Sequence, residues 1–219
     1  MNSTLKYLIR EPKTKTKNPS LLLILHGYGS NEEDLFSFAE ELPDNLLIVS
    51  LRAPLSLDFG GYAWYGLQID ASNNTVSNIP EALVAKETII KFIDKLQKKF
   101  SFNPQKSFLM GFSQGSILSY AIALSFPKKI TNIIALSGYI NTDITTFSEK
   151  PSEDYKDLDF FCSHGTEDPI IPVKMARKAI TTLEENTIKY MYKEYYTGHA
   201  VTPQNFSDFK NWISAILDK

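Results

Sequence analysis

The chain has few of the features that would tie it to a membrane or to a disulfide framework. Its 219 residues include a single cysteine, Cys162, which excludes a disulfide within the chain. The longest purely aliphatic run, residues 21–25, is too short to cross a bilayer, and residues 1–5 lack the parts of a secretory signal. We therefore expect a cytoplasmic protein without stable membrane insertion, with Cys162 as a small buried hydrophobe.

Charge and missing motifs exclude further classes. The formal net charge is −2 and the lysines are scattered, so nucleic acid is not expected as a partner. There are only three histidines, no H-E-x-x-H pattern and no paired cysteines, so we expect no metal site. The chain also lacks G-x-G-x-x-G and Walker patterns. No cofactor is expected.

What the sequence does contain is an alternation of strand and helix patterns, without repeats or breaks in composition. This pattern predicts one α/β domain over residues 1–219. Several strands are unbroken apolar runs, which is typical of a mostly parallel central sheet with helices on both faces. The expected strands are residues 4–10, 21–26, 46–51, 106–110, 130–136, 158–164 and 188–195. The expected helices are residues 32–42, 80–100, 114–125, 173–186 and 203–217.

Residues 52–79 form a connection too long to be a plain loop, and they carry several large apolar side chains. Such a segment indicates either a lid or pocket wall, or a satellite cluster packed on the edge of the sheet. The Gly60-Gly61 pair fits a hinge or a fixed turn equally well. The candidate pocket residues are Leu57, Phe59, Trp64 and Tyr65.

The most informative motif is Gly111-Phe112-Ser113-Gln114-Gly115, which lies directly between a predicted strand and a predicted helix. A serine at such a turn is typical of a nucleophile elbow, where small neighbours let the helix approach the sheet. A serine hydroxyl needs a base and a third group that orients the base. We therefore searched the histidines and carboxylates for these partners.

His199 lies on a loop after the last predicted strand, so it can reach Ser113 and is the candidate base. His26 and His164 end strands directly before glycines, and we interpret both as structural. The acid should follow the carboxyl end of a strand. Asp168 does so, although Asp-Pro is also a common turn starter. The order Ser113, Asp168, His199 is that of the α/β-hydrolases, and this order favours Asp168.

The alternatives for the acid are few. Glu167 is the nearest competitor, and Asp157 and Asp159 precede their strand and belong to the opposite end of the sheet. Acyl transfer also needs donors for an oxyanion, which backbone amides supply well. We assign these donors to the amides of Gln114, directly after the serine, and Tyr28, in the glycine-rich loop after the second strand.

Several ordered segments resemble the phospholipase/carboxylesterase family that includes the acyl-protein thioesterases: residues 25–32, 62–65, 111–115, 163–172 and 198–201. The resemblance covers nearly the whole chain. It implies an α/β-hydrolase fold with no cap domain, the triad Ser113, Asp168 and His199, and an oxyanion hole at the amides of Tyr28 and Gln114. It also implies hydrolysis of a small-molecule ester or thioester without a cofactor, and it leaves a homodimer possible.

One residue bears on the choice of substrate. Tyr28 stands where thioesterase members of the family commonly carry leucine, which favours short to medium acyl chains over long ones. Our hypothesis is therefore a carboxylesterase that forms an acyl-enzyme on Ser113. The alternatives are an acyl-protein thioesterase or lysophospholipase acting on long chains, and a binding protein that keeps the fold without turnover.

Overall fold

The computed structural model describes residues 5–14, 17–69 and 75–218. Its centre is a seven-stranded sheet with the strand order β1-β3-β2-β8-β9-β10-β11. All neighbouring strands pair in parallel except β1, which runs antiparallel to β3 at one edge. The prediction of a mostly parallel sheet is confirmed. The strands are β1 (Tyr7–Arg10), β2 (Ser20–Leu25), β3 (Leu46–Leu51), β8 (Phe108–Phe112), β9 (Asn132–Leu136), β10 (Asp159–Gly165) and β11 (Lys189–Tyr195).

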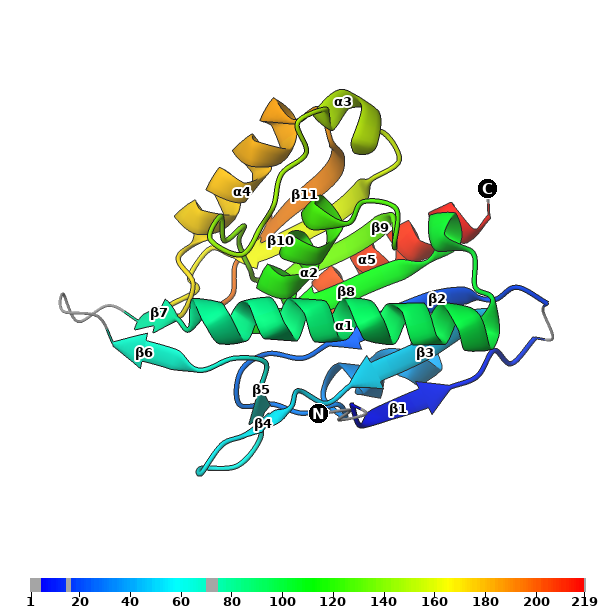
Figure 1. Cartoon of the computed structure of the whole chain (residues 1–219), viewed down its shortest axis with the longest axis horizontal. Coiled ribbons are helices and arrows are strands. Elements are labelled where there is room, and N and C mark those ends of the chain that lie inside the picture. Colours follow the sequence, from blue (N-terminus) through cyan, green and yellow to red (C-terminus); the bar gives the residue numbers. More distant parts are fainter. Residues whose placement is uncertain (1–4, 15–16, 70–74, 219) are drawn as a thin grey trace.

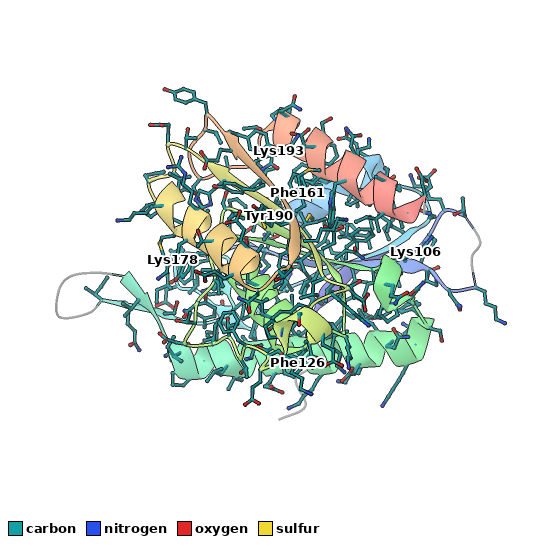
Figure 2. All side chains as sticks on the ribbon, turned by 90° about the horizontal axis from the view of Figure 1, so that it is seen from above. Lys106, Phe126, Phe161, Lys178, Tyr190 and Lys193 are labelled. Atoms are coloured by element: carbon teal, nitrogen blue, oxygen red, sulfur yellow. The ribbon has the colours of Figure 1, made fainter. Side chains whose placement is uncertain are left out.

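Helices cover both faces of this sheet. In Figure 1 the helices α1, α2 and α4 lie in front of the strands and α5 lies behind them. Figure 2, seen from above, places α5 and α1 on opposite sides of the sheet, with Phe161 of β10 between them. In the described residues, no helix combines the length and the apolar character that crossing a bilayer requires. The helices are α1 (Ile79–Phe100), α2 (Gln114–Ser125), α3 (Pro151–Asp154), α4 (Val173–Glu185) and α5 (Pro203–Leu217).

The apolar run of β2 explains why the sheet needs two covering layers. Leu21, Leu23 and Leu25 belong to the core shared with α1 and α2, whereas Leu22 and Ile24 belong to the core shared with α5. Successive side chains of a strand point to opposite faces, so a strand covered on both faces is apolar at every position. The same reasoning applies to β3, whose six residues are all buried and all apolar except Ser50.

Residues 32–42 differ from their prediction, since they contain the 3₁₀ helix η1 (Leu35–Glu41) instead of an α-helix. The cause is competition for carbonyl groups. Pro43 has no N–H to donate to the carbonyl of Ala39, and that carbonyl instead accepts from the guanidinium of Arg10 at 2.5 Å. The same guanidinium also binds the carbonyls of Leu42, Pro43 and Leu46.

The other differences lie at element ends and in short elements. Thr4, the first residue of the first predicted strand, lies outside the described residues. The predicted strand 106–110 begins later, because Pro104–Lys106 form the 3₁₀ turn η2, capped by the side chain of Asn103. In residues 52–79, of which 70–74 are not described, two small hairpins are present: β4 (Leu55–Ser56) with β5 (Tyr62–Ala63), and β6 (Leu67–Ile69) with β7 (Thr75–Ser77).

Candidate active site

Ser113 lies at the turn between β8 and α2, in a backbone conformation that side chains rarely adopt. Its φ is 53° and its ψ is −117°. The Ser113 N–H donates to the carbonyl of Leu136 at 2.9 Å, and its own carbonyl accepts from Ile117 of α2. The surrounding strands and helix thus hold a strained residue in place, as functional turns commonly require.

The two glycines of the motif allow this turn because nothing larger fits. A Cβ on Gly115 would lie 2.2 Å from the carbonyl oxygen of Leu25, at the end of β2. A Cβ on Gly111 would lie 2.2 Å from the carbonyl oxygen of Gly115. The first turn of α2 therefore packs directly on the backbone of two adjacent strands, and it carries Ser113 to the carboxyl edge of the sheet.

Asp168 and His199 meet at the same edge, although 31 residues separate them. His199 Nδ1 donates to Asp168 Oδ2 at 2.6 Å. The other carboxylate oxygen, Oδ1, accepts from the amides of Ile170 and Ile171 at 2.8 and 2.9 Å. Both oxygens are therefore engaged, and the carboxylate fixes the orientation of the His199 ring.

These contacts also keep Asp168 ionised. Burial alone would raise its pKa, but the hydrogen bonds from His199 and from the amides of Ile171 and Ile170 lower the pKa below its ordinary value. The neighbouring Glu167 is exposed and does not contact His199 through any hydrogen bond of the described residues. Asp159 lies at the start of β10 and pairs with Lys189, at the opposite edge of the sheet.

The other two histidines are held mainly by backbone groups, and His164 Nε2 also lies 3.3 Å from Asp168 Oδ2. His26 Nδ1 donates to the Gly27 carbonyl at 2.7 Å and Nε2 accepts from the Ala53 amide at 3.0 Å, which fixes a neutral ring. Burial lowers the pKa of His26 further. His164 is fully buried and its Nε2 donates to the Ile171 carbonyl at 2.7 Å. Both rings support turns, as their positions before glycines predict.

Two backbone amides lie beside Ser113 without acceptors. Within the described residues, the backbone amides of Tyr28 and Gln114 donate no hydrogen bond. The next amide along the loop, that of Gly29, donates to the Tyr62 carbonyl. Tyr28 and Gln114 line the same cavity as Ser113 and His199. An anionic oxygen in this cavity would therefore find donors whose direction the fold already fixes.

The cavity has a volume of about 420 Å³ and is mostly apolar. It lies at the carboxyl edge of the sheet, where in Figure 1 the β6–β7 hairpin approaches the start of α4. Ser113 and His199 face it from two sides. Its walls are formed by Tyr28, Tyr65, Leu67, Ser77, Ser113, Gln114, Ile117, Tyr139, Ile170, Ile171, Met175 and His199.

Of the four candidate pocket residues, only Tyr65 lines this cavity. The prediction that Trp64 lines the pocket is corrected. Its indole is buried, donates to the His26 carbonyl at 2.9 Å and packs on the His26 ring. Phe59 is 74% exposed and packs beside Tyr28. Leu57 lies in the turn of the β4–β5 hairpin, where its carbonyl accepts from Gly60. That hairpin turns away from the cavity, which explains the difference.

Sequence reasoning missed most of the cavity wall. Tyr139 follows β9, and Ile170 and Ile171 follow Asp168, so the rule that functional groups follow strand ends would have found these three. Ser77 and Met175 carry no such signal. In the part of the chain that the structure describes, no three histidine, cysteine or acidic side chains gather to hold a metal ion.

The side chain of Gln114 was also missed, and it holds one wall of the cavity. Its Oε1 accepts from the Trp64 amide at 2.8 Å, and its Nε2 donates to the Tyr65 carbonyl at 2.9 Å. The residue is buried. Gln114 thus offers its backbone amide to the cavity and fixes the 64–65 segment with its side chain.

We expect Gly115→Ala to lower the free energy of unfolding by about 2 to 3 kcal/mol, because the new methyl group would force α2 away from Leu25. Urea denaturation measures this change. Gly198→Ala is the control, because a Cβ there meets no atom closer than 3.8 Å. Equal stability of the Gly115→Ala variant and the wild type would contradict the close contact.

We expect Gln114→Glu to show a stability defect that grows with pH. A protonated carboxyl can donate to the Tyr65 carbonyl as the amide does, whereas a buried carboxylate cannot. Burial raises the carboxyl pKa in the folded state, so stability is retained below about pH 4 and lost as pH rises through that raised value. Denaturation between pH 4 and 8 tests this, with Gln114→Ala as the control whose defect should stay constant. A constant defect in both variants would contradict the role of Nε2.

Comparisons with known proteins identify the family and the fold of the chain. The model of the phospholipase/carboxylesterase family matches residues 7–217. An acyl-protein thioesterase 1 of Candida albicans is 24% identical over 96% of this chain and 98% of its own. A probable carboxylesterase SOBER1-like of Arabidopsis thaliana is 26% identical over 89% and 78%. The crystal structure of esterase PE8 superposes with a TM-score of 0.82 at 23% identity, over 97% and 99% of the two chains. The chain has the α/β-hydrolase fold and belongs to the phospholipase/carboxylesterase family.

Proposed function

We propose that the chain is a serine hydrolase that cleaves carboxylic esters through an acyl-enzyme on Ser113. One observation carries the proposal: the strained Ser113 and the Asp168–His199 pair face the same apolar cavity. An activated serine, an oriented histidine and free backbone donors are the three requirements of acyl transfer. The family supports hydrolysis in general, and the cavity supports small acyl groups.

In the first half-reaction, Ser113 Oγ attacks the ester carbonyl carbon and its proton passes to His199 Nε2. The carbonyl oxygen becomes an oxyanion, which accepts from the amides of Tyr28 and Gln114. When the intermediate collapses, the bond from carbon to the alcohol oxygen breaks and His199 returns the proton to that oxygen. The alcohol leaves, and the acyl group stays bonded to Ser113.

In the second half-reaction, water takes the place of the alcohol. His199 accepts one proton from the water as it attacks the acyl carbon, and then donates it to Ser113 Oγ as the acid leaves. Asp168 stays ionised and stabilises the positive ring at each step. Among the hydrogen bonds of the described residues none joins Ser113 Oγ to His199, and such bonds commonly form only when substrate is bound.

The cavity favours acyl chains of short to medium length. Its volume of about 420 Å³ is at the lower end for small-molecule sites. Tyr28, which takes the place of a smaller leucine in thioesterases, forms part of the wall and packs beside Phe59. The substrate we propose is therefore a small ester.

A second candidate is a long-chain acyl-thioesterase or lysophospholipase. Leu67 and Ile170 line the cavity and are 41% and 67% exposed, so a chain too long for the cavity would run outward over them. A relative named acyl-protein thioesterase 1 adds to this alternative. Both candidates use the same catalytic residues.

We expect Ser113→Ala to abolish hydrolysis of nitrophenyl butyrate and labelling by a fluorophosphonate probe, because the nucleophile is gone. Ser116→Ala is the matched control, since that hydroxyl is buried on α2 without a partner in the described residues. Circular dichroism checks the fold of both. Wild-type protein that neither hydrolyses the ester nor reacts with the probe would instead indicate a binding protein on a hydrolase fold.

We expect kcat/KM for nitrophenyl esters to be highest between about four and eight acyl carbons and to fall about tenfold at sixteen, because the part of the longer chain outside the cavity stays largely in water and must still be ordered. The series from acetate to palmitate, assayed below micelle-forming concentrations, measures this. A maximum at palmitate would favour the long-chain candidate instead.

A further inference from the structure

Apart from Ser113 and Tyr28, three residues of the cavity wall carry hydroxyl groups. Tyr65 follows the β5 strand, Ser77 ends the β7 strand and Tyr139 follows the β9 strand. All three residues line the cavity beside apolar side chains such as Ile117 and Met175. Three distant segments therefore contribute hydroxyl-bearing residues to one wall.

These hydroxyls lie close to one another. Burial raises the pKa of the Tyr65 and Tyr139 phenols, and the neighbouring Ser77 hydroxyl opposes that rise in both. Burial is the dominant effect, so the pKa of both phenols stays above its ordinary value and each keeps its proton. The cluster is therefore a group of neutral donors.

The hydroxyl of Tyr65 is the unusual member. The residue is fully buried, and its hydroxyl makes no hydrogen bond of ordinary geometry within the described residues, although the Ser77 hydroxyl lies near it. A buried donor without a partner destabilises the folded state, because it has lost its hydrogen bond to water. Phenylalanine would fill the same space without that cost, so the hydroxyl calls for an explanation.

Other tyrosines of the chain show how such a group is normally satisfied. Tyr155 donates to the Leu124 carbonyl at 2.9 Å, Tyr120 donates to Cys162 Sγ at 3.0 Å, and Tyr195 donates to Asp208 at 2.7 Å. None of these three lines the cavity. Among the buried tyrosine hydroxyls of the described residues, the one without a protein partner thus belongs to a residue of the cavity wall, beside the space that a ligand would occupy.

We infer that the hydroxyls of Tyr65, Ser77 and Tyr139 form a polar subsite for substrates whose acyl group carries a second oxygen, a ketone or a hydroxyl, beyond the ester carbonyl. This inference rests on the proposed function, because it concerns the acyl group held beside Ser113. The hydroxyls would donate hydrogen bonds to this second oxygen. An entirely apolar wall would weaken binding of the same group, because burying a carbonyl without a donor costs free energy. The subsite therefore distinguishes oxygenated acyl groups from plain alkyl ones.

The test compares nitrophenyl hexanoate with nitrophenyl 4-oxohexanoate and 5-oxohexanoate, which differ from it by one ketone. In the wild type, we expect kcat/KM for at least one oxo ester to equal or exceed that for hexanoate. An entirely apolar wall would lower it at least tenfold instead. Ketones are chosen because they accept hydrogen bonds without cyclising as hydroxyacyl esters do.

Tyr65→Phe should lower the ratio of kcat/KM for the favoured oxo ester over hexanoate by about fivefold to tenfold, because one hydrogen bond is lost. Ser77→Ala should lower the same ratio. The control is Tyr7→Phe on β1, where Tyr7 packs against Phe92 away from the cavity and the ratio should stay at the wild-type value. The ratio within each variant cancels general losses of activity.

Binding provides a readout that does not need turnover. Ethyl 5-oxohexanoate, ethyl 4-oxohexanoate and ethyl hexanoate are titrated into Ser113→Ala and Ser113→Ala/Tyr65→Phe protein by calorimetry. Binding of an oxo ester that weakens with the loss of the phenol, without hydrolysis by the wild type, would keep the subsite and overturn the proposed function. Hydrolysis of hexanoate with both oxo esters disfavoured, and a ratio unchanged by Tyr65→Phe, would overturn the subsite alone.

Discussion

The contact between the first turn of α2 and the end of β2 is the constraint on which the rest of the site depends. Because Gly115 lies against the carbonyl of Leu25, the serine turn and the loop after β2 are brought side by side. The amides of Gln114 and Tyr28 come from these two segments. One backbone contact therefore positions Ser113 and both candidate oxyanion donors together.

Gln114 extends this contact to the substrate cavity. Its side chain binds the backbone of Trp64 and Tyr65, while the Trp64 indole binds the carbonyl of His26. The helix start, the loop after β2 and the cavity wall thus form one hydrogen-bonded unit. The main chain of Tyr65 belongs to this unit. The point from which its side chain enters the cavity wall is therefore fixed relative to Ser113.

The sequence predicts the layers of the fold well because buried parallel strands leave continuous apolar runs, and it predicts which groups meet because strand ends share one edge. It does not predict the cavity wall. Trp64 and Tyr65 are adjacent aromatic residues, and hydrogen bonds to distant residues decide which of them lines the cavity. The partners of Trp64 are Gln114 and the His26 carbonyl, 50 and 38 residues away in the sequence. The 3₁₀ helix at Leu35–Glu41 is not predicted for the same reason. The guanidinium of Arg10, on β1, donates to the carbonyls of Ala39 and Leu42 at the end of this helix.

The three histidines show how hydrogen bonds decide between roles that position leaves open. All three follow strand ends, so topology alone allows each to act as a base. Both ring nitrogens of His26 form hydrogen bonds with backbone groups. His164 is fully buried, and its Nε2 donates to the Ile171 carbonyl. His199 alone has a carboxylate at Nδ1 and lines the cavity. A ring can shuttle a proton only if one nitrogen faces the substrate site while the other is held, and of the three rings it is His199 that has a held nitrogen and a place in the cavity wall.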